Sequence, residues 1–387
     1  MTNISKDIEA LKKEMTDWRH HIHTYPETAF EEQKTTQYII EQLKSFGIDE
    51  LYTEFAPTGV VGIIKGKKEG KWVGLRADID ALDVIEKNDI NYCSKIPGKM
   101  HACGHDGHTA MLLGAAKYLA QHRDFAGTVV VIFQPAEENE GGGRVMVENG
   151  LFKRFPIESV FGMHNQPNMP LGHFLICQGP IMAAYDTFEI KLTGLGAHAA
   201  APHLGKDTIV LASHIAIALQ TIASRNANPF DSLVVSITQI HSGDTWNVLP
   251  QEAVIRGTVR SFKKDVQDMA EKRINEISQG LAATFNAKAE VRYERRYPAT
   301  INHKVETDVA IEVASKIVGA ENVVTVVEPS LGDEDFAFML QEKPGAYIWL
   351  GAGPGANLHN PAYNFNDEVL TTGAAYYVGI VNAQLGK

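Results

Sequence analysis

A thiol, two imidazoles and a carboxylate fall within six residues of this chain, in the segment CGHDGH at 103–108. Cysteine and histidine side chains are good ligands for zinc and similar metal ions. The same residues at the start of a helix can equally serve packing and capping. On this segment alone both interpretations stay open, and the elements that bring other side chains beside it must decide between them.

Further candidate ligands follow apolar runs that predict strands. The runs lie at 60–65, 72–77, 127–133, 160–163 and 346–350. An unbroken apolar run, as at 127–133, is typical of a strand that is buried on both faces. Acidic and imidazole side chains come after these runs, at Asp78, Glu137, Glu138, His164 and His359.

Predicted helices alternate with these strands. Helical periodicity predicts two helices at 5–23 and 31–46, one after His108 and a short one at 144–150. Such an alternation predicts a mostly parallel sheet that is covered on both faces. Sites in sheets of this kind form beyond the carboxyl ends of the strands. We therefore expect the candidate ligands to meet Cys103 and His105 at one rim.

Some neighbouring polar residues have simpler interpretations. His20, His21 and His23 occupy near-adjacent helical positions, so their side chains point in different directions and do not favour a shared metal site. Glu31 and Glu32 suit the start of the second helix, where the helix dipole favours carboxylates.

Asp78 and Asp80 come directly after a predicted buried strand. Turn and capping chemistry explains acids at such a position. A carboxylate that orients a metal-bound histidine explains them as well. Both interpretations stay open, with Asp78 as the first choice for the orienting role.

The middle of the chain changes character. Strands are predicted at 187–192, 233–242, 253–261 and 289–294, and helices at 207–224 and 265–285. The order strand, helix, strand, strand, helix, strand is the split βαβ, or ferredoxin-like, arrangement. We expect it to be a separate domain, 184–298, inserted into a catalytic domain made of 1–183 and 299–387.

Composition excludes several classes of protein. The chain has 387 residues, 44% of them hydrophobic, and a net charge of −11. An acidic chain without a basic cluster is not expected to bind nucleic acid or an anionic membrane. No signal peptide or membrane span is expected from the hydropathy pattern. Three cysteines favour a reducing cytoplasm over a disulfide framework.

At this point the chain resembles a known family, the M20 metallopeptidases, in the subgroup of N-acyl-amino-acid amidohydrolases and hippurate hydrolases. The resemblance covers essentially the whole chain. It rests on motifs at 18–27, 75–82, 101–108, 134–138, 162–164, 196–203, 247–250 and 334–336. One departure is Asp83, where the subgroup usually has proline.

The resemblance implies an enzyme with two divalent metal ions per chain, zinc, manganese, cobalt or nickel. The implied ligands are Cys103, His105, Glu138, His164 and His359, with Cys103 as the bridge. Many relatives in the wider family have a bridging aspartate at the position of Cys103. Glu137 matches the glutamate that acts as general acid and base.

The resemblance also implies substrate contacts. His198 and Asn247 match residues of the inserted domain that contact substrate, and in family dimers they reach the partner subunit's site. Arg260 matches an arginine for the substrate carboxylate, and Gly353 a backbone N–H donor near the site. The implied activity is hydrolysis of N-acyl-L-amino acids by a cytoplasmic homodimer, or alternatively deacetylation of N-acetyl-diaminopimelate or another N-acetyl amino acid.

Three rival interpretations remain. A nucleophilic Cys103 with His105 or His108 as its base leaves the other candidate ligands unexplained. A zinc deaminase pairs its histidine with Cys-x-x-Cys, which this chain lacks. A non-catalytic metal-binding protein of the same fold has no use for an intact Glu137 beside the metal ligands.

Overall fold

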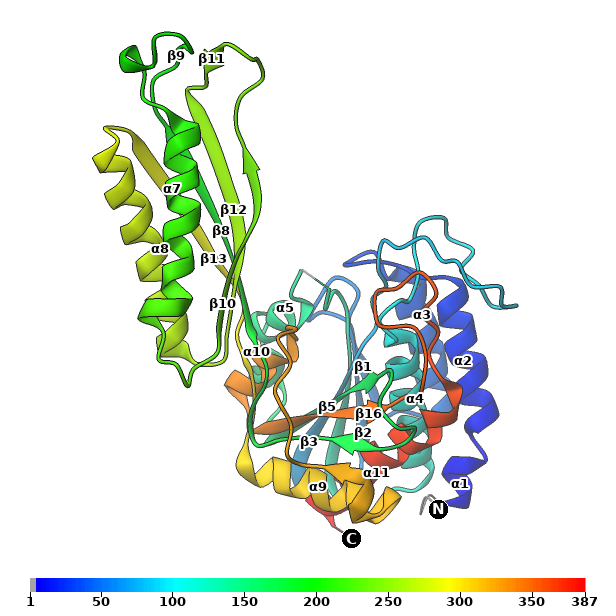
Figure 1. Cartoon of the computed structure of the whole chain (residues 1–387). Coiled ribbons are helices and arrows are strands. Elements are labelled where there is room, and N and C mark those ends of the chain that lie inside the picture. Colours follow the sequence, from blue (N-terminus) through cyan, green and yellow to red (C-terminus); the bar gives the residue numbers. More distant parts are fainter. Residues whose placement is uncertain (1–4, 139, 387) are drawn as a thin grey trace. The chain divides into compact units, whose positions relative to one another are not determined.

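The computed structural model describes residues 5–138 and 140–386, which fall into two compact units (Figure 1). The first unit contains the residues up to Ile181, Thr300–Glu328 and those from Asp335 onward. The second unit contains Met182–Ala299 and also Pro329–Glu334. This last, short return was not predicted, because it depends on backbone contacts such as those from the Ala183 N–H to the carbonyl oxygens of Ser330 and Gly332.

The first unit is built on an eight-stranded sheet in the order β1-β2-β4-β3-β5-β16-β6-β15. Its strands are β1 (Glu50–Tyr52), β2 (Val60–Lys65), β3 (Lys68–Asp78), β4 (Ala126–Gln134), β5 (Ser159–Gln166), β6 (Phe174–Leu175), β15 (Val323–Val324) and β16 (Gly345–Gly351). The central strands β4, β3, β5 and β16 are parallel to their neighbours in this series. The predicted α/β fold with a large, mostly parallel sheet is confirmed. A small two-stranded sheet pairs β7 (Gly179–Met182) with β14 (Thr300–Asn302).

Burial on both faces explains the unbroken apolar runs. Along β4, Val129, Val131 and Phe133 join one core cluster, whereas the fully buried Ile132 points the other way because side chains alternate in a strand. Helices α4 and α11 pack on β3 on the first face. On the opposite face, Gly162 of β5 lies against Phe336 of α10.

The helices of the first unit begin and end near their predicted positions where a prediction was made. They are α1 (Lys6–Glu9), α2 (Lys12–Thr24), α3 (Gln33–Phe46), α4 (His105–Gln121), α5 (Gly142–Glu148), α6 (Leu151–Arg154), α9 (Lys304–Val318), α10 (Phe336–Glu342) and α11 (Leu370–Leu385). The single helix predicted at 5–23 is in fact two helices, since the helix is interrupted between Glu9 and Lys12.

The second unit is a four-stranded antiparallel sheet in the order β10-β12-β8-β13, with two helices on one face. Its elements are β8 (Ala184–Thr193), α7 (Thr208–Thr221), β10 (Leu233–His241), β12 (Glu252–Ser261), α8 (Lys264–Thr284) and β13 (Lys288–Tyr297). In β8, Phe188, Ile190 and Leu192 are buried against the helices and alternate with less buried residues. A small two-stranded antiparallel sheet of β9 (Ala197–His198) and β11 (Val248–Leu249) extends from this unit (Figure 1).

One helix, over Thr208–Asn226, is long and apolar enough to cross a membrane when judged by length and composition alone. A single helix of this kind is weak evidence for a span, because the core helix of a globular unit passes the same test. Its inner side chains, Leu211, Ile215 and Leu219 among them, pack in the core of the second unit.

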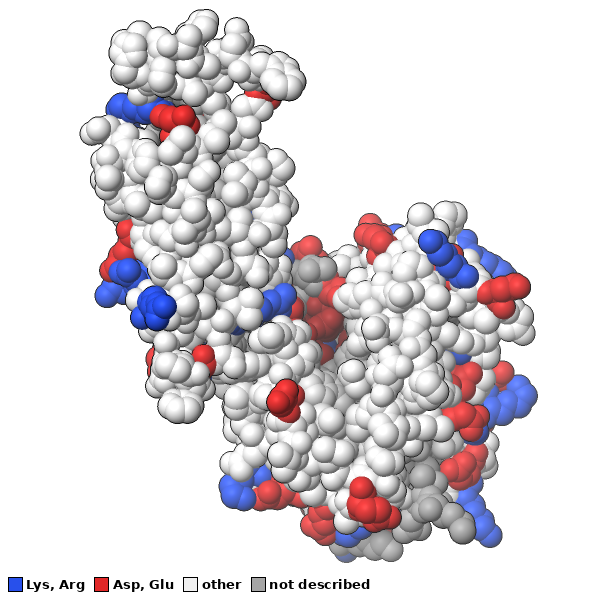
Figure 2. Space-filling view, viewed as in Figure 1, with Lys and Arg blue, Asp and Glu red and all other residues white. Residues whose placement is uncertain are grey.

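Figure 2 shows Lys and Arg interspersed with Asp and Glu over the face that it draws.

Candidate metal centre

Cys103 and His105 flank a tight turn at the start of α4. Gly104 is the N-cap residue and has a φ of +93°, in the left-handed region that glycine adopts without strain. A Cβ atom at this position would lie 2.3 Å from Oδ1 of Asn165, so the backbone can approach only because Gly104 has no side chain. Cys103 and His105 are both buried. The turn therefore presents a thiol and an imidazole from adjacent sides of one glycine.

Glu137 and Glu138 follow β4 through a bend at Ala136, whose φ is +54°. Consecutive side chains on an extended segment point to opposite sides. A left-handed residue directly before the pair changes the chain direction and lets both carboxylates serve one site. The bend lies directly after Pro135.

The remaining two candidate ligands come from β5 and from the loop after its neighbour in the sheet, β16. His164 lies inside β5, paired with Trp349 of β16, and not after the strand as predicted. His359 lies in the loop after β16 with a φ of +63°, and its N–H donates to the carbonyl oxygen of Ala102. This backbone hydrogen bond, 2.8 Å long, ties the loop of His359 to the segment that carries Cys103.

All five predicted ligands come together in the structure. Cys103 Sγ lies 3.4 Å from His164 Nε2, and His359 Nε2 lies 3.1 Å from Glu138 Oε1. Potential ligand atoms within 4.8 Å of one another define overlapping groups, namely Cys103 with His105 and His164, Cys103 with Glu138 and His359, and His105 with Glu137 and Glu138. Cys103, His105 and Glu138 each belong to two of these groups, so they link the groups into one cluster. The bridging role of Cys103 stays a prediction.

The donor set fits a metal centre. Within the described part of the chain, His105 Nε2 is buried without a hydrogen bond, and the buried Glu138 Oε1 has only the His359 imidazole beside it, at 3.1 Å. A buried polar atom left in this state costs about 1–3 kcal/mol. A divalent cation among these atoms satisfies both. Thiolate and imidazole donors disfavour magnesium and calcium, which prefer oxygen ligands.

Burial sets the protonation of these groups in opposite directions. Burial, with the charges of Glu138 and Glu137, raises the pKa of the Cys103 thiol well above its ordinary value. Burial and the charge of His108 hold the pKa of His164 well below its ordinary value, so this imidazole is neutral and can accept a metal ion. Burial also opposes a charged His105, but Asp78 and Asp80 raise its pKa to about 10. Metal binding at Cys103 and His105 must therefore displace protons.

Asp80, more than Asp78, holds the candidate ligands in place. Its Oδ1 lies 3.1 Å from His105 Nδ1, and its Oδ2 accepts a hydrogen bond of 2.9 Å from the N–H of Glu138. Asp78 instead lies 2.6 Å from His108 Nδ1 and accepts from Arg76 at 2.7 Å. The predicted orienting role for Asp78 thus concerns His108, and its oxygen is 3.8 Å from His105 Nε2.

His108 supports the site and does not reach it as a ligand. Asp78, His105 and His108 also form a group of metal-type side chains. Both ring nitrogens of His108 are nevertheless engaged, Nδ1 by Asp78 and Nε2 by Asn165 Oδ1 at 2.7 Å. Asn165 in turn donates to the Tyr363 hydroxyl, which anchors the His359 loop to β5.

A buried ionic network fixes the start of α4 from behind. Arg19 of α2 is fully buried and donates to Asp106 at 3.1 Å and to Asp367. His23 contacts the same Asp106 through Nδ1 at 2.9 Å and Glu86 through Nε2 at 3.1 Å. The sequence analysis assigned no role to Arg19. The available signal was its spacing, since Arg19 and His23 are four residues apart and lie on one face of the helix.

This network makes the stability of the fold depend on pH. Burial opposes a charged His23, but Asp106 and Glu86 raise its pKa to about 9. A folded pKa above the unfolded value of about 6.5 gives stability that is complete below pH ~6.5 and lost as the pH rises through 9. We expect His23→Gln to cost about 3 kcal/mol at pH 6 and much less at pH 9.5. Urea unfolding of parent and variant across this range measures the difference, and a difference that stays constant with pH contradicts the assignment.

His198 and Asn247 lie together at the small β9–β11 sheet of the second unit. The Ala199 N–H donates to the carbonyl oxygen of Asn247, and His198 pairs with Val248 across the two strands. The Ala200 N–H donates to His198 Nδ1 at 3.0 Å, so the ring proton of the neutral imidazole lies on the exposed Nε2. The β9–β11 sheet thus offers one imidazole N–H and one amide side chain to an outside partner. The predicted contact of His198 and Asn247 with substrate stays a prediction.

The two other predicted substrate contacts, Arg260 and Gly353, differ in whether they have N–H groups left for a substrate. The guanidinium of Arg260 is paired with Asp333 and lies 4.0 Å from the ring centroid of Tyr185, which leaves further N–H donors for a carboxylate. The prediction that Gly353 offers its N–H to substrate is wrong in this structure. That N–H donates to the carbonyl oxygen of Met169 at 2.9 Å, because the loop after β16 folds against the loop after β5 there.

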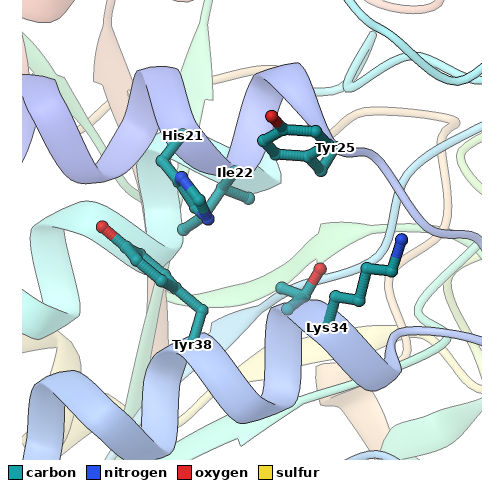
Figure 3. Close-up of a pocket in the computed structure, with 6 residues that line it drawn as sticks. His21, Ile22, Tyr25, Lys34 and Tyr38 are labelled. Atoms are coloured by element: carbon teal, nitrogen blue, oxygen red, sulfur yellow. The ribbon is translucent and has the colours of Figure 1, made fainter.

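A separate cavity of about 260 Å³ lies between α2 and α3 (Figure 3). Its lining residues are His21, Ile22, Tyr25, Lys34, Thr35 and Tyr38. The His21 and Tyr38 rings stack at 4.1 Å on one of its walls. None of the candidate ligands lines it, so this cavity and the metal-type cluster are different places in the first unit.

Comparison with known proteins identifies the relatives of this chain. Residues 74–383 match the family described as Peptidase family M20/M25/M40. The chain is 40% identical to a hippurate hydrolase of Campylobacter jejuni, with 97% of each chain covered. It is also 40% identical to an N-acetyl-L-cysteine deacetylase of Bacillus subtilis, which covers 96% of this chain and 88% of the relative.

Solved structures agree with the sequence relatives. A Bacillus subtilis protein described as a dinuclear metal binding peptidase from the M20 family superposes with a TM-score of 0.85 and 34% identity. The match covers 96% of this chain and 98% of that one. The likeness therefore extends over both compact units of the chain and their connections.

Proposed function

Because the chain belongs to Peptidase family M20/M25/M40, we propose that it is a metal-dependent amidohydrolase that cleaves N-acyl-L-amino acids into a carboxylic acid and a free amino acid. The observation that carries this proposal is the position of Glu137. A buried carboxylate stands one residue before a candidate metal ligand, inside a cluster of five such ligands. Relatives that act on hippurate and on N-acetyl-L-cysteine support the substrate class.

Each residue of the cluster has a task in amide hydrolysis. The side chains that would hold two divalent ions are Cys103, His105, Glu138, His164 and His359. When bound, such a pair of ions supplies an activated water near neutral pH and polarises the scissile carbonyl. Glu137 takes the proton from the attacking water and delivers it to the nitrogen of the leaving amino acid. Asp80 keeps both His105 and the backbone of Glu138 oriented during these transfers.

Residues of the second unit complete the proposal on the substrate side. The Nε2–H of His198 donates to the carbonyl oxygen as negative charge develops on it. Asn247, beside it at the β9–β11 sheet, donates a hydrogen bond from its side-chain amide to the substrate. Arg260 binds the free carboxylate of the amino-acid part, for which its planar guanidinium is suited.

We do not propose Cys103 as a nucleophile. Nucleophilic cysteines have a lowered pKa, which comes from a positively charged setting. Here burial and two glutamates raise the pKa of Cys103 instead. A metal ion at Sγ removes this conflict, because it stabilises the thiolate directly.

We expect a chelator to abolish hydrolysis of N-acyl amino acids and added zinc, manganese, cobalt or nickel to restore it. The measurement is amino-acid release from N-benzoyl and N-acetyl amino acids, each compared with its C-terminal amide. Compounds with a free carboxylate are expected to react at least about tenfold faster, since a charge-assisted hydrogen bond contributes about 1.5–3 kcal/mol. Full activity in the chelated protein would show that the metal-dependent proposal is wrong.

Arg260→Ala supplies the specificity arm of this experiment. The variant is expected to lose the preference for the free acid over the amide, while turnover of the amide changes little. Lys272→Ala, on the exposed surface of α8, is the matched control and is expected to keep the preference. An Arg260→Ala variant that discriminates as well as the parent removes Arg260 from the carboxylate site.

We further propose that the protein is a cytoplasmic homodimer joined through the second unit. Helix α7 exposes Ile209, Val210 and Ile217, the last of them 72% exposed. It lies in the same unit as β10, an edge strand with an exposed Ile240. Exposed apolar patches on a folded unit mark interaction surfaces, and an open strand edge can pair with a second copy. Neither nucleic acid nor a membrane is proposed as a partner, and the three free cysteines suit a reducing compartment.

Ile217→Glu is expected to convert the dimer into monomers, because a charge on this patch cannot be buried against a second copy. Sedimentation equilibrium measures the mass. Gln279→Glu, which places the same charge on the exposed side of α8, is expected to stay dimeric. If His198 and Asn247 serve the partner subunit's site, the Ile217→Glu monomer also loses hydrolysis. A parent that sediments as a monomer contradicts the proposal.

A further inference from the structure

The bend between β4 and the glutamate pair is held in an unusual backbone conformation. Ala136 adopts a φ of +54°, a region that residues other than glycine, asparagine and aspartate rarely adopt. Such a residue persists only when its surroundings fix it. Its carbonyl oxygen accepts a hydrogen bond of 3.0 Å from the N–H of Gly142. The residue that fixes its N–H comes from a distant part of the chain.

That residue is Glu32, at the start of α3. Its side chain is fully buried, and its Oε1 accepts a hydrogen bond of 2.9 Å from the Ala136 N–H. Its Oε2 lies 2.5 Å from the Thr58 hydroxyl. Asp80 accepts in the same way from the Glu138 N–H at 2.9 Å. Two carboxylates therefore hold the backbone on either side of Glu137.

Helix α3 does not need this carboxylate at its start. Glu32 occupies the N-cap position of α3, but its side chain makes no capping hydrogen bond. Glu27 caps the first turn of α3 instead, since its Oε2 accepts hydrogen bonds from the Thr35 N–H at 2.9 Å and from the Thr35 hydroxyl at 3.1 Å. The expectation that Glu32 serves the helix dipole therefore gives way to a contact with the catalytic segment.

Keeping Glu32 buried opposes its charge. Burial raises the pKa of Glu32 to about 7, and the nearby Asp80 contributes to the same shift. A side chain that served only to fill space would be apolar at this position, since burying a carboxyl group is unfavourable without a polar partner.

We propose that Glu32 is a positioning residue for Glu137: by holding the left-handed Ala136 through its N–H, it aims the Glu137 carboxylate at the reacting water. This inference rests on the proposed amidohydrolase function. Glu32 acts through the backbone, since its carboxylate oxygens accept from the Ala136 N–H and the Thr58 hydroxyl. What matters for this role is the length of the side chain, which we call its reach, because it places an acceptor oxygen at the Ala136 N–H.

Three variants separate reach from charge. Glu32→Gln keeps an oxygen acceptor at the same distance and removes the charge. Glu32→Asp keeps the charge and shortens the side chain by one methylene. Glu27→Asp is the matched control, because the same shortening weakens the capping of α3 and leaves the bend untouched. Values of kcat, KM, metal content and melting temperature are measured for each variant and the parent.

Glu32→Asp is expected to lower kcat about 10²-fold, the loss that a misplacement of about 1 Å can cause, with KM and two metal ions per chain unchanged. Glu32→Gln is expected to keep most of the parent kcat. Glu27→Asp is expected to lower the melting temperature at unchanged kcat. The proposal is overturned if Glu32→Asp keeps the parent kcat, if Glu32→Gln loses as much as Glu32→Asp, or if Glu27→Asp loses kcat to the same extent.

A crystallographic measurement keeps this test separate from the proposed activity. Structures of the parent and of Glu32→Asp are expected to show Ala136 leaving the left-handed region in the variant and the Glu137 carboxylate displaced. If the parent cleaves no N-acyl amino acid, the proposed function fails, and this displacement still decides whether Glu32 holds the bend. An Ala136 that keeps its conformation in the variant overturns the positioning role.

Discussion

Glu137→Gln is expected to lower kcat by about 10²–10⁴-fold, the range that a positioned general acid and base contributes. The amide cannot accept a proton from water, yet it has nearly the volume of the carboxylate and leaves the buried site packed. Glu137 is not among the five proposed ligands, so two metal ions per chain are expected to remain. The measurement pairs steady-state kinetics with elemental analysis of the same sample.

The control for this variant is Glu148→Gln on the exposed side of α5, eleven residues further along the chain. It removes one negative charge from the neighbourhood without entering the cluster, and it is expected to keep the parent kcat. A Glu137→Gln protein with full kcat contradicts the proton-transfer role. A protein that has lost both metal ions instead assigns Glu137 to the ligand set.

Replacement of Cys103 is expected to have the second large effect, and the outcome depends on the new side chain. Cys103→Ala removes the atom shared by two ligand groups, so metal affinity should fall by more than the 10- to 100-fold that the loss of a supporting residue costs. Hydrolysis is then expected to disappear. Cys103→Asp supplies a carboxylate that can again bridge two ions, so this variant should retain metal and part of the activity.

This pair of variants separates the metal mechanism from nucleophilic catalysis. A cysteine nucleophile has no substitute in aspartate, so Cys103→Asp and Cys103→Ala would be equally inactive under that mechanism. Cys177→Ala, a half-buried thiol in the segment before β7, is the control for the loss of a cysteine. Equal metal content in Cys103→Ala and the parent contradicts the bridging role.

The sequence carries the positions of the central strands because their burial leaves a direct trace. A strand buried on both faces must be apolar at consecutive residues, as in β4 and β16, and no other element of ten residues or fewer gives that pattern so clearly. Once strands and helices alternate, the parallel sheet follows, and so does the meeting of Cys103, Glu138 and His359 at one rim. The convergence of the five ligands could therefore be predicted without knowing any distance.

The supporting layer could not be predicted, because tertiary contacts choose the partners of a buried carboxylate. Asp78 and Asp80 are equivalent as a sequence pattern, and only the fold shows that Asp80 reaches His105 and the Glu138 N–H. Glu32 fits a helix start just as well as it fits the bend at Ala136, a residue 104 positions away. The available signal was the presence of a second carboxylate, since Glu27 already lay where a side chain can cap the first turn of α3. Glu32 was therefore not needed for that cap.

Two further differences have local causes. His164 lies inside β5 because its backbone continues the pairing with β16 beyond the apolar run, so a polar residue need not end a strand. The Gly353 N–H is engaged by Met169 because the loop after β16 folds against the loop after β5. Loop hydrogen bonds of this kind depend on contacts between distant segments, and composition carries no trace of them.

The central claim is that five side chains hold two metal ions and share Cys103 between them. Anomalous diffraction from crystals of the protein loaded with zinc tests it most directly. We expect two peaks per chain within about 2.0–2.3 Å of ligand atoms of Cys103, His105, Glu138, His164 and His359, with Cys103 Sγ in contact with both. An absence of peaks among these residues, or a single peak that Cys103 does not touch, would contradict the account.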